Sequence, residues 1–440
     1  MSSTPKRKEN AVEPIHERPI TAVIVGAGHR SLMYASFAKQ HPEQLKIVGV
    51  VEPDDERRAL TKERFELPED GCFADLETFT SKPKMADAVI NGTLDHIHVA
   101  TSIPLLKAGY DILLEKPIGI SEEEVLRLYE EAQRYGRKVM ICHVLRYAPF
   151  YASIRRQLAD GVIGNIVSVT TSENVSYHHM GMAYVRGKWG NKGKSGSSML
   201  MAKSCHDLDI ITWMMGEVKP VKVSSFGSLL QFRPQNAPAG AGTRCMVDCR
   251  IEDTCAYSAR KNYIEQRLWR GYVTYNTHLG VQGSDEELAE SLRTDSPYGR
   301  CVWRCDNDVV DHQTVIIEFA DGSTGTHVMT GGVSKPGRSI HIIGTKGEIQ
   351  GDMEEGAYTI RHPDARKGHI YAERRIELGV TKDMHGGGDL RLVEDFVKGL
   401  LGAEPSISST ALDKSINGHL IGFAADQSRL EQKIVELKPV

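Results

Sequence analysis

The chain has 440 residues, a length typical of two or three domains. With 40% hydrophobic and 25% charged residues it has the composition of a globular protein, which excludes collagen-like, fibrous and disordered classes. Its net charge of −4 leaves no basic surplus for phosphate binding, so we expect no nucleic-acid partner.

Residues 1–18 form a polar tail that we expect to be disordered. Its one basic cluster, Lys6-Arg7-Lys8, is interpreted as solvated, and the tail has no apolar segment of the kind that a secretory signal requires. No stretch of the sequence approaches the roughly 18 to 20 apolar residues of a membrane span. We therefore expect a cytoplasmic protein without membrane contact, whose cysteines are reduced.

Residues 19–142 alternate strands with helices. The apolar segment 20–25 predicts a buried parallel strand that leads into a glycine-rich turn. Further strands are predicted at 45–51, 88–90, 111–114 and 138–142. The clearest helix begins after Ser121, where Glu124 completes a capping box, and ends at Gly136. This alternation predicts a doubly wound parallel sheet, the Rossmann architecture.

Residues 143–440 have a different pattern. Apolar and polar residues alternate over 314–319, and Asp321-Gly322 indicates a hairpin to a strand that runs through Val328. Other strands are predicted at 166–175, 221–230 and 339–343, and helices at 204–215, 389–401 and 408–437. We expect an antiparallel or mixed sheet that carries helices, with the Pro/Gly-rich stretch 234–242 as a loop within this second α/β domain.

The glycine-rich turn has the features of a dinucleotide site. Gly26 and Gly28 stand between a buried strand and a helix, where a pyrophosphate can approach the backbone and the helix N-terminus. Ser31 replaces the third glycine, so the helix must pack on the sheet around a hydroxymethyl group. Glu52 ends the next strand, where a carboxylate accepts hydrogen bonds from ribose hydroxyls and repels a 2′-phosphate. The sequence therefore predicts NAD rather than NADP.

Three further motifs carry a family resemblance. Thr93-Leu94-Asp95-His96-Ile97-His98 and Glu115-Lys116-Pro117 resemble the T-x-x-x-x-H and E-K-P signatures of the Gfo/Idh/MocA oxidoreductases. His206-Asp207-Leu208-Asp209 resembles their H-x-x-D element. The resemblance covers the chain from Ile20 onward. It implies a Rossmann domain followed by an α/β domain with a large open, mostly antiparallel sheet.

The same resemblance implies a function and an assembly. Nicotinamide is expected in the cleft between the two domains, with a sugar, cyclitol or glycoside as substrate. Members of the family pair through the second-domain sheet, so a homo-oligomer, a dimer or a tetramer, is expected. The cofactor-binding residues expected from the turn and the motifs together are Gly26, Gly28, His29, Arg30, Ser31, Glu52, Thr93, His98, Glu115 and Lys116.

Two residues are the main catalytic candidates. Oxidation of a secondary alcohol requires a proton acceptor whose pKa lies near the working pH. A lysine that is partly desolvated beside the cationic nicotinamide ring has a lowered pKa, which suits Lys116 to that role. Pro117 is expected to fix the backbone that aims Lys116, and a cis peptide bond is one way of doing so. His206, at a helix start that faces the cleft, is the second candidate.

The sequence departs from the family pattern beside this histidine. Many members carry an aspartate four residues before it, but here the position is Ala202. A simple Lys–Asp–His triad is therefore not expected. We assign the neighbouring Lys203 to a contact with the substrate or the transition state.

Other polar side chains are candidate sugar contacts. They follow the last Rossmann strand, lie in a loop that continues to Trp189, or open a helix near the C-terminus: His143, Arg146, Tyr147, Tyr177, His178, His179, Asp209 and His385. Asp389 follows His385 at the start of that last helix, and its alternative role is that of the helix N-cap. Convergence of several of these histidines on a catalytic metal is a second interpretation, although their spacing matches no metal motif.

Five cysteines fall in two clusters, Cys245-x3-Cys249-x5-Cys255 and Cys301-x3-Cys305. Four of these thiolates would suit a structural zinc ion, which would pin the Pro/Gly-rich insertion to the sheet. An iron–sulfur cluster is the second interpretation. Buried reduced cysteines are the third, because none of the spacings is a CxxC pair.

Two reactions fit these residues. The first is net oxidation of a secondary hydroxyl of a sugar, cyclitol or glycoside, with release of NADH. The second is redox-neutral cleavage of a glycoside, in which a transient 3-keto sugar acidifies the neighbouring C–H before elimination, and the electrons are then returned. A non-catalytic NAD(H)-sensing protein is the alternative from another class, and the presence of both Lys116 and His206 argues against it.

Overall fold

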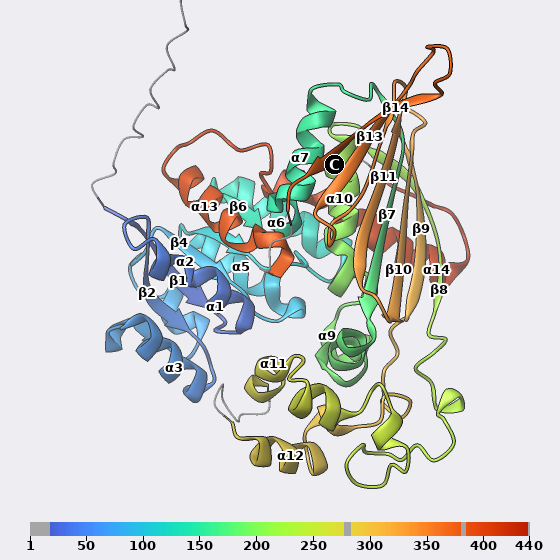
Figure 1. Ribbon diagram of the computed structural model, residues 1–440. Helices are drawn as coiled ribbons and strands as arrows, with labels where there is room; N and C mark the ends of the chain where they lie inside the picture. Colours follow the sequence, from blue (N-terminus) through green and yellow to red (C-terminus); the bar gives the residue numbers. More distant parts are fainter. Residues whose placement is uncertain (1–17, 277–282, 380–383, 439–440) are drawn as a thin grey trace, which may run out of the picture.

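The computed structural model describes residues 18–276, 283–379 and 384–438, which build two β-sheets flanked by helices (Figure 1). The first sheet has six strands in the order β3-β2-β1-β4-β5-β6, and the second has nine in the order β14-β13-β12-β11-β7-β10-β9-β8-β15. The predicted fold class, a Rossmann domain plus a second α/β domain with a large, mostly antiparallel sheet, is confirmed.

All pairings in the first sheet are parallel. Its strands are β1 (Ile20–Val25), β2 (Leu45–Val51), β3 (Cys72–Phe73), β4 (Ala88–Asn91), β5 (Asp111–Leu114) and β6 (Val139–Ile141). The helices between them are α1 (His29–Ala35), α2 (Phe37–Gln40), α3 (Asp55–Phe65), α4 (Leu76–Thr80), α5 (His98–Lys107) and α6 (Glu122–Tyr135). The strand order changes direction at β1 and β4, which opens a crevice at their carboxyl ends, the usual ligand site of such sheets.

Helix α6 begins and ends where the sequence predicts. The Ser121 hydroxyl accepts a hydrogen bond from the Glu124 backbone N–H at 3.2 Å, and Gly136 adopts a φ of +59° as the C-cap. The predicted capping box is wrong in its second half. The Glu124 carboxylate accepts from the backbone N–H of Ile120 at 2.9 Å, so it ties down the residue before the N-cap.

In the second sheet every neighbouring pair is antiparallel except β7 and β10. Its strands are β7 (Ile166–Ser176), β8 (Pro220–Ser228), β9 (His312–Phe319), β10 (Thr324–Val333), β11 (Gly337–Gly344), β12 (Glu348–Asp352), β13 (Ala357–Pro363), β14 (Tyr371–Glu377) and β15 (Val435–Glu436). Helices α7 (Pro149–Ala159), α10 (Cys205–Met215) and α14 (Leu412–Glu431) share one apolar core with the sheet. The predicted C-terminal helix is thus shorter than expected, because the chain ends in an edge strand against β8.

The segment 229–311 between β8 and β9 is an insertion that shares one core with residues of the segment 175–202. It contains α11 (Arg270–Tyr275) and α12 (Asp285–Arg293), which Figure 1 shows at the bottom of the view, beyond the end of the larger sheet. Its buried side chains include Phe232, Tyr263 and Leu288. The sequence predicted only a loop at 234–242, because short helices joined by irregular chain leave no sustained periodicity.

The C-terminal helices return to the Rossmann sheet. Helix α13 (Gly388–Leu400) buries Leu392, Val393, Phe396 and Val397 in the same core as β1 and β2. The first half of α14 contributes Leu412, Ile416 and Leu420 to the core on the opposite face of that sheet. Residues beyond the predicted boundary at 142 therefore complete the core of the first domain. Because α14 also packs on the larger sheet, it connects the two sheets.

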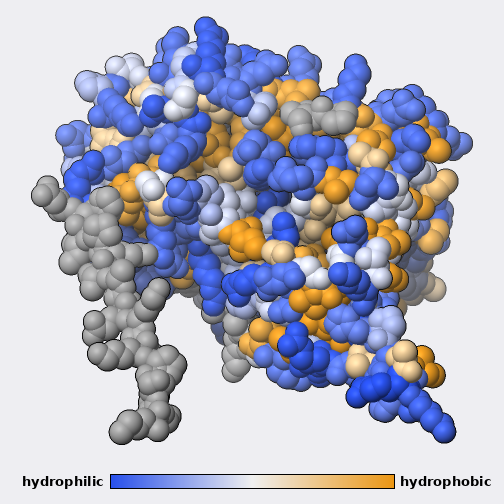
Figure 2. Space-filling view, turned by 90° about the horizontal axis from the view of Figure 1, so that it is seen from above, coloured by the Kyte–Doolittle hydropathy of each residue, from blue (hydrophilic) through white to orange (hydrophobic). Residues whose placement is uncertain are grey.

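The surface seen in Figure 2 is mainly hydrophilic, with hydrophobic residues in separate patches. On the larger sheet, Val167, Phe226, Ile316 and Ile343 are exposed on alternate positions of their strands. Within the residues that the structure describes, no helix is long and apolar enough to cross a membrane.

Candidate active site

The glycine-rich turn is shaped by two glycines for different reasons. Gly26 has a φ of +80°, and a Cβ there would lie 3.0 Å from the carbonyl oxygen of Gly92. Gly28 has an ordinary φ of −74°, and the nearest protein atom to a Cβ there is 3.9 Å away. The protein itself thus requires Gly26, whereas the bare backbone at Gly28 leaves open space at the N-terminus of α1, where a pyrophosphate fits.

Ser31 takes the place of the third glycine without disturbing the packing of α1. Its side chain is fully buried, and a Cβ on Gly92 would collide with its hydroxyl oxygen. The close approach between α1 and the sheet is made possible by Gly92, in the segment after β4, instead of by a glycine in α1. This exchange explains how the turn tolerates a serine.

Glu52 lies at the carboxyl end of β2 and is buried beside the turn. One carboxylate oxygen accepts from the backbone N–H of Ala27 at 2.7 Å, and the other accepts from the N–H of Asp54 at 3.1 Å. A carboxylate oxygen can accept more than one hydrogen bond, so both retain capacity for ribose hydroxyls. The position and burial of Glu52 fit the adenosine half of NAD.

His98 holds together the loops that follow β4 and β5. The two ring nitrogens of His98 lie 3.0 Å from the carbonyl oxygen of Thr93 and 2.6 Å from that of Pro117. The Lys116–Pro117 peptide bond is cis. His98 therefore joins the loop after β4 to the loop after β5 and positions them. The predicted direct contact of His98 with the cofactor stays a prediction.

A chain of charged side chains runs from α1 to α13 behind Lys116. The Glu115 carboxylate accepts from Nε of Arg30 and from the hydroxyl of Tyr34, both at 2.9 Å, and from the Lys116 backbone N–H at 2.5 Å. Arg30 also pairs with Asp389, whose other carboxylate oxygen lies 3.1 Å from Nδ1 of His385. Asp389 is thus part of this network, and Arg30 faces protein carboxylates.

The Lys116 ammonium points across the cleft. Its Nζ donates to the carbonyl oxygen of Ala202 at 2.8 Å and lies 5.9 Å from the ring centre of Trp189. Ala202 is the position at which the motif resemblance predicts an aspartate, and here a backbone oxygen receives the amine. Lys116 consequently reaches the second domain one helical turn before His206.

Four imidazoles cluster around this amine. The ring of His206 lies 5.5 Å from that of His143 and 5.8 Å from that of His385, and His143 lies 5.3 Å from His419. Burial lowers the pKa of His206 well below its ordinary value, and the charge of Lys116 acts in the same direction. Burial likewise lowers the pKa of His385, against the opposing effect of Asp389. Both rings are therefore neutral near pH 7 and able to accept a proton.

Lys203 belongs to a buried charge cluster under the sheet face. Its Nζ lies 3.0 Å from Glu173 on β7, which also pairs with Arg338 on β11 at 2.5 Å. Arg338 Nε lies 3.1 Å from Asp207 as well. Burial lowers the pKa of Lys203, although Glu173 opposes this. Burial raises the pKa of Asp207. This cluster places the Lys203 amine, whose pKa is lowered, beside the cleft.

Three predicted substrate residues have structural partners instead. Arg146 and Asp209 form a buried pair with two hydrogen bonds of 2.7 and 2.6 Å, and further Arg146 donors bind the carbonyl oxygens of Ser409 and Lys414. The Tyr147 hydroxyl donates to Asp395 of α13 at 2.7 Å. These groups fix the returning C-terminal helices, because their hydrogen-bonding capacity is used within the protein.

His178 and His179 meet an aromatic residue of the insertion. The indole N–H of Trp269 donates to Nδ1 of His178 at 2.9 Å, and the ring of His179 lies 4.4 Å from the same indole. Burial lowers the pKa of His179 well below its ordinary value, with the charge of Lys203 acting in the same direction. Tyr177 packs edge-on against Tyr257, within the core of the insertion. Of these three, His179 is thus the one adjacent to the catalytic groups.

The insertion also contacts the cofactor turn. The Tyr275 hydroxyl donates to the carbonyl oxygen of Ala27 at 2.6 Å, and the Arg57 guanidinium lies 4.9 Å above its ring. Tyr272 lies edge-on to His29, with the ring centres 6.5 Å apart. No sequence motif predicts these contacts, because they join segments more than 200 residues apart.

The cysteine clusters do not form a metal centre. Cys245, Cys249, Cys255 and Cys301 line one small cavity, but the described residues contain no group of three or more His, Cys, Asp or Glu side chains placed to hold a metal. The buried Arg186 guanidinium donates to the Cys245 sulfur at 3.3 Å and places a positive charge among the thiols. The zinc and iron–sulfur predictions are therefore unsupported, and so is the interpretation of the histidines as a metal site. All eight cysteines are free.

The fold and the site define a nicotinamide-dependent oxidoreductase. The Rossmann sheet carries a glycine-rich turn with an acid after β2, and Lys116 extends toward the buried His206. Comparison with known families agrees: residues 20–143 match the oxidoreductase family with an NAD-binding Rossmann fold, and residues 155–410 match its C-terminal alpha/beta domain. The chain belongs to the Gfo/Idh/MocA oxidoreductase family.

Individual relatives resemble most of the chain. The Bacillus subtilis (strain 168) protein YteT, an oxidoreductase by name, is 25% identical over 421 residues, which cover 89% of this chain and 94% of YteT. Inositol 2-dehydrogenase of Corynebacterium glutamicum is 27% identical over 312 residues, 68% of this chain and 79% of that enzyme. The structure of levoglucosan dehydrogenase in complex with NADH is similar in fold, with a TM-score of 0.70 at 16% identity, over 96% of this chain and 100% of that one.

Proposed function

We propose that the protein is an NAD-dependent dehydrogenase that oxidises a secondary hydroxyl of a sugar, cyclitol or glycoside. The observation that carries this proposal is the position of the Lys116 amine, 2.8 Å from the Ala202 carbonyl oxygen, where its charge acts on the buried imidazole of His206. The names of the relatives support the substrate class, since two of them are dehydrogenases of a cyclitol and of an anhydrosugar.

In this proposal the nicotinamide, when bound, accepts the hydride from the carbinol carbon. The N-terminus of α1 with Gly28 would hold the pyrophosphate, and Glu52 would hold the adenosine ribose. Lys116 orients the substrate hydroxyl and receives its proton, because its amine extends to the Ala202 carbonyl oxygen across the cleft. His206 relays that proton, and burial keeps its ring neutral for the task. Glu115, fixed by Arg30 and Tyr34, positions the backbone of Lys116.

A second candidate is the redox-neutral cleavage of a glycoside. It requires a further base to remove the proton next to the transient ketone and an acid for the departing group. Lys203, His179 and His385 supply more acid–base groups than a simple oxidation needs, and burial lowers the pKa of each. We favour the dehydrogenase, because Lys116 and His206 suffice for it.

One experiment separates the two. The enzyme is incubated with NAD and either free sugars and inositols or their 4-nitrophenyl glycosides, while NADH and nitrophenol are followed by absorbance. The proposal predicts stoichiometric NADH and an intact glycosidic bond. Release of nitrophenol with catalytic NAD and no accumulating NADH would establish the second candidate. Tight NADH binding without turnover of any sugar, cyclitol or glycoside would establish the NAD(H)-sensing alternative.

We also propose that the protein is a homo-oligomer paired through the open face of the larger sheet. The support is the row of exposed apolar side chains on this face, of which Phe226 is 72% exposed. Size-exclusion chromatography with light scattering tests this directly. A monomer at micromolar concentration would contradict it.

A further inference from the structure

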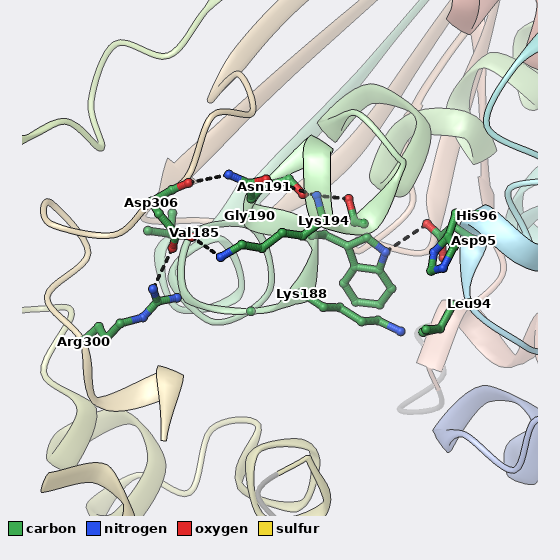
Figure 3. A pocket seen from close by; sticks show the side chains of 13 residues that line it. Leu94, Asp95, His96, Val185, Lys188, Gly190, Asn191, Lys194, Arg300 and Asp306 are labelled. Carbon is green, nitrogen blue, oxygen red and sulfur yellow. Dashed lines mark hydrogen bonds and ion pairs between the residues drawn. The ribbon is translucent and has the colours of Figure 1, made fainter. Parts of the chain in front are cut away.

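A cavity of about 240 Å³ lies beside the catalytic cleft, between the two domains and the insertion. Figure 3 shows Leu94, Asp95 and His96 of the Rossmann domain on one side and Arg300 and Asp306 of the insertion on the other, with Lys188 and Lys194 between them. None of the residues 26–31 of the cofactor turn lines it, so the pyrophosphate site lies elsewhere. Neither proposed reaction uses this cavity.

Trp189 forms a rigid aromatic wall of the cavity. Its indole N–H donates to the buried carboxylate of Asp95 at 3.0 Å, and the same carboxylate oxygen accepts from the Ser197 hydroxyl at 2.7 Å. The ring is thereby fixed while half-buried, with Lys116 Nζ 5.9 Å from its centre. A ring that binds in the cavity would therefore adjoin the reaction centre, and the apolar face of a sugar packs well on such an indole.

The charges around the cavity leave one cation without a carboxylate partner. Asp306 pairs with both Lys194 and Arg300, the latter at 2.6 Å. The Asp95 carboxylate accepts hydrogen bonds from Trp189 and Ser197, and its charge acts on Lys188 without forming an ion pair with it. Lys188 is exposed and lies 4.3 Å above the Trp189 ring, and it forms no ion pair with any residue that the structure describes. An anionic group that enters the cavity could therefore bind Lys188, which points toward Leu94 and away from Asp306 (Figure 3).

We propose that this cavity binds a negatively charged sugar residue, carrying a carboxylate or a sulfate, next to the ring that is oxidised. Trp189 packs against the sugar ring and Lys188 binds its anionic group. The inference rests on the proposed function, because it makes the substrate an acidic glycoside. It goes further in naming a second binding site and the charge of its ligand.

The test uses a matched pair of disaccharides, cellobiose and cellobiouronic acid, which differ by one carboxylate. Their affinities for the NADH-loaded full-length enzyme are measured by calorimetry. A sulfated disaccharide forms a third arm that distinguishes the two anionic groups. We expect the acidic disaccharide to bind about tenfold more tightly than the neutral one, and 0.5 M salt to remove most of the difference.

The variants are Lys188→Ala and, as a matched control, Lys192→Ala. Lys192 is an exposed lysine of the same segment whose side chain does not line the cavity. Lys188→Ala should weaken binding of cellobiouronic acid about fivefold to tenfold and cellobiose far less, while Lys192→Ala changes neither. Equal affinity of wild-type enzyme for the two disaccharides, equal losses in the two variants, or no binding of any acidic disaccharide would overturn the inference.

These outcomes are distinct from failure of the proposed function. If neutral sugars reduce NAD but acidic disaccharides have no advantage, the dehydrogenase stands and the second site is wrong. If no sugar is oxidised, binding of the acidic disaccharide and its dependence on Lys188 are still measured by calorimetry.

Discussion

On the cofactor side of the cleft, the residues marked out by the sequence act through backbone geometry, whereas on the substrate side they act through side-chain pairs. Gly26 and Gly28 are fixed by a positive φ and by open space, and Glu52 accepts from two backbone N–H groups. Arg146 and Asp209, both expected at the substrate, instead bind each other. The cofactor side is thus determined by a local turn. The substrate side depends on which side chains the fold brings together.

The substrate side also carries the chemistry. Burial lowers the pKa of the Lys203 amine and of the His206 imidazole on this side. Perturbed ionisable groups concentrated in a cleft are typical of active sites. Substitutions on the two sides should therefore separate catalysis from cofactor binding, and four predictions test that separation.

The largest effect is expected for Lys116→Ala. Loss of the proton acceptor should lower kcat about a thousandfold, while the Kd for NADH changes less than about threefold. Initial rates from NADH absorbance and binding from NADH fluorescence measure the two quantities. Lys107→Ala, an exposed lysine at the end of α5, is the control and should leave both unchanged. A parallel loss of NADH affinity in Lys116→Ala would contradict the separation of catalysis from cofactor binding.

The two glycines of the turn should respond differently. Gly28→Ala should weaken NADH binding about tenfold to a hundredfold without changing the thermal midpoint, because its Cβ meets only space that the cofactor needs. Gly26→Ala should in addition destabilise the fold by about 1–2 kcal/mol, because φ is positive and backbone atoms lie 3.0 Å from the new Cβ. Thermal unfolding and fluorescence titration measure both. Unchanged NADH affinity in Gly28→Ala would refute the assignment of the pyrophosphate to this turn.

Glu52 should determine the choice of dinucleotide. Glu52→Gln removes the charge but keeps one acceptor oxygen, so the preference for NADH over NADPH should fall about tenfold. Titration of both nucleotides gives the ratio, and Glu56→Gln on the exposed surface of α3 is the control. If the wild-type enzyme binds NADPH as tightly as NADH, the role given to Glu52 is wrong.

The smallest effect is expected where the insertion touches the cofactor turn. Tyr275→Phe removes the 2.6 Å hydrogen bond to the Ala27 carbonyl oxygen and should raise the Kd for NADH up to about fivefold, with kcat unchanged. Stopped-flow displacement of NADH should show the change as faster release. Tyr371→Phe, an exposed tyrosine of β14, serves as the control. Unaltered release from Tyr275→Phe would mean that the insertion does not stabilise the turn.

Much of the Rossmann half was predictable because its signals are local. A buried strand, a glycine-rich turn and an acid at the next strand end lie within 33 residues, from Ile20 to Glu52. Ser121 and Gly136 set the limits of α6. The Ser121 side chain accepts from a backbone N–H of the first turn, and Gly136 adopts the left-handed conformation that ends the helix. Motif resemblance added Lys116 and His206, whose spacing is not periodic but whose order along the chain is distinctive.

The sequence by itself thus determined the two architectures, the cofactor turn and the two main catalytic candidates. Only the tertiary structure decided that Arg146 pairs with Asp209, that Asp389 joins Arg30 behind Lys116, and that Arg186 donates to Cys245 in a cavity lined by four cysteines. Partners such as residues 30 and 389 come together through the packing of whole helices. A buried charge then takes whichever opposite charge that packing supplies, because leaving it unpaired costs more than any local preference can offset.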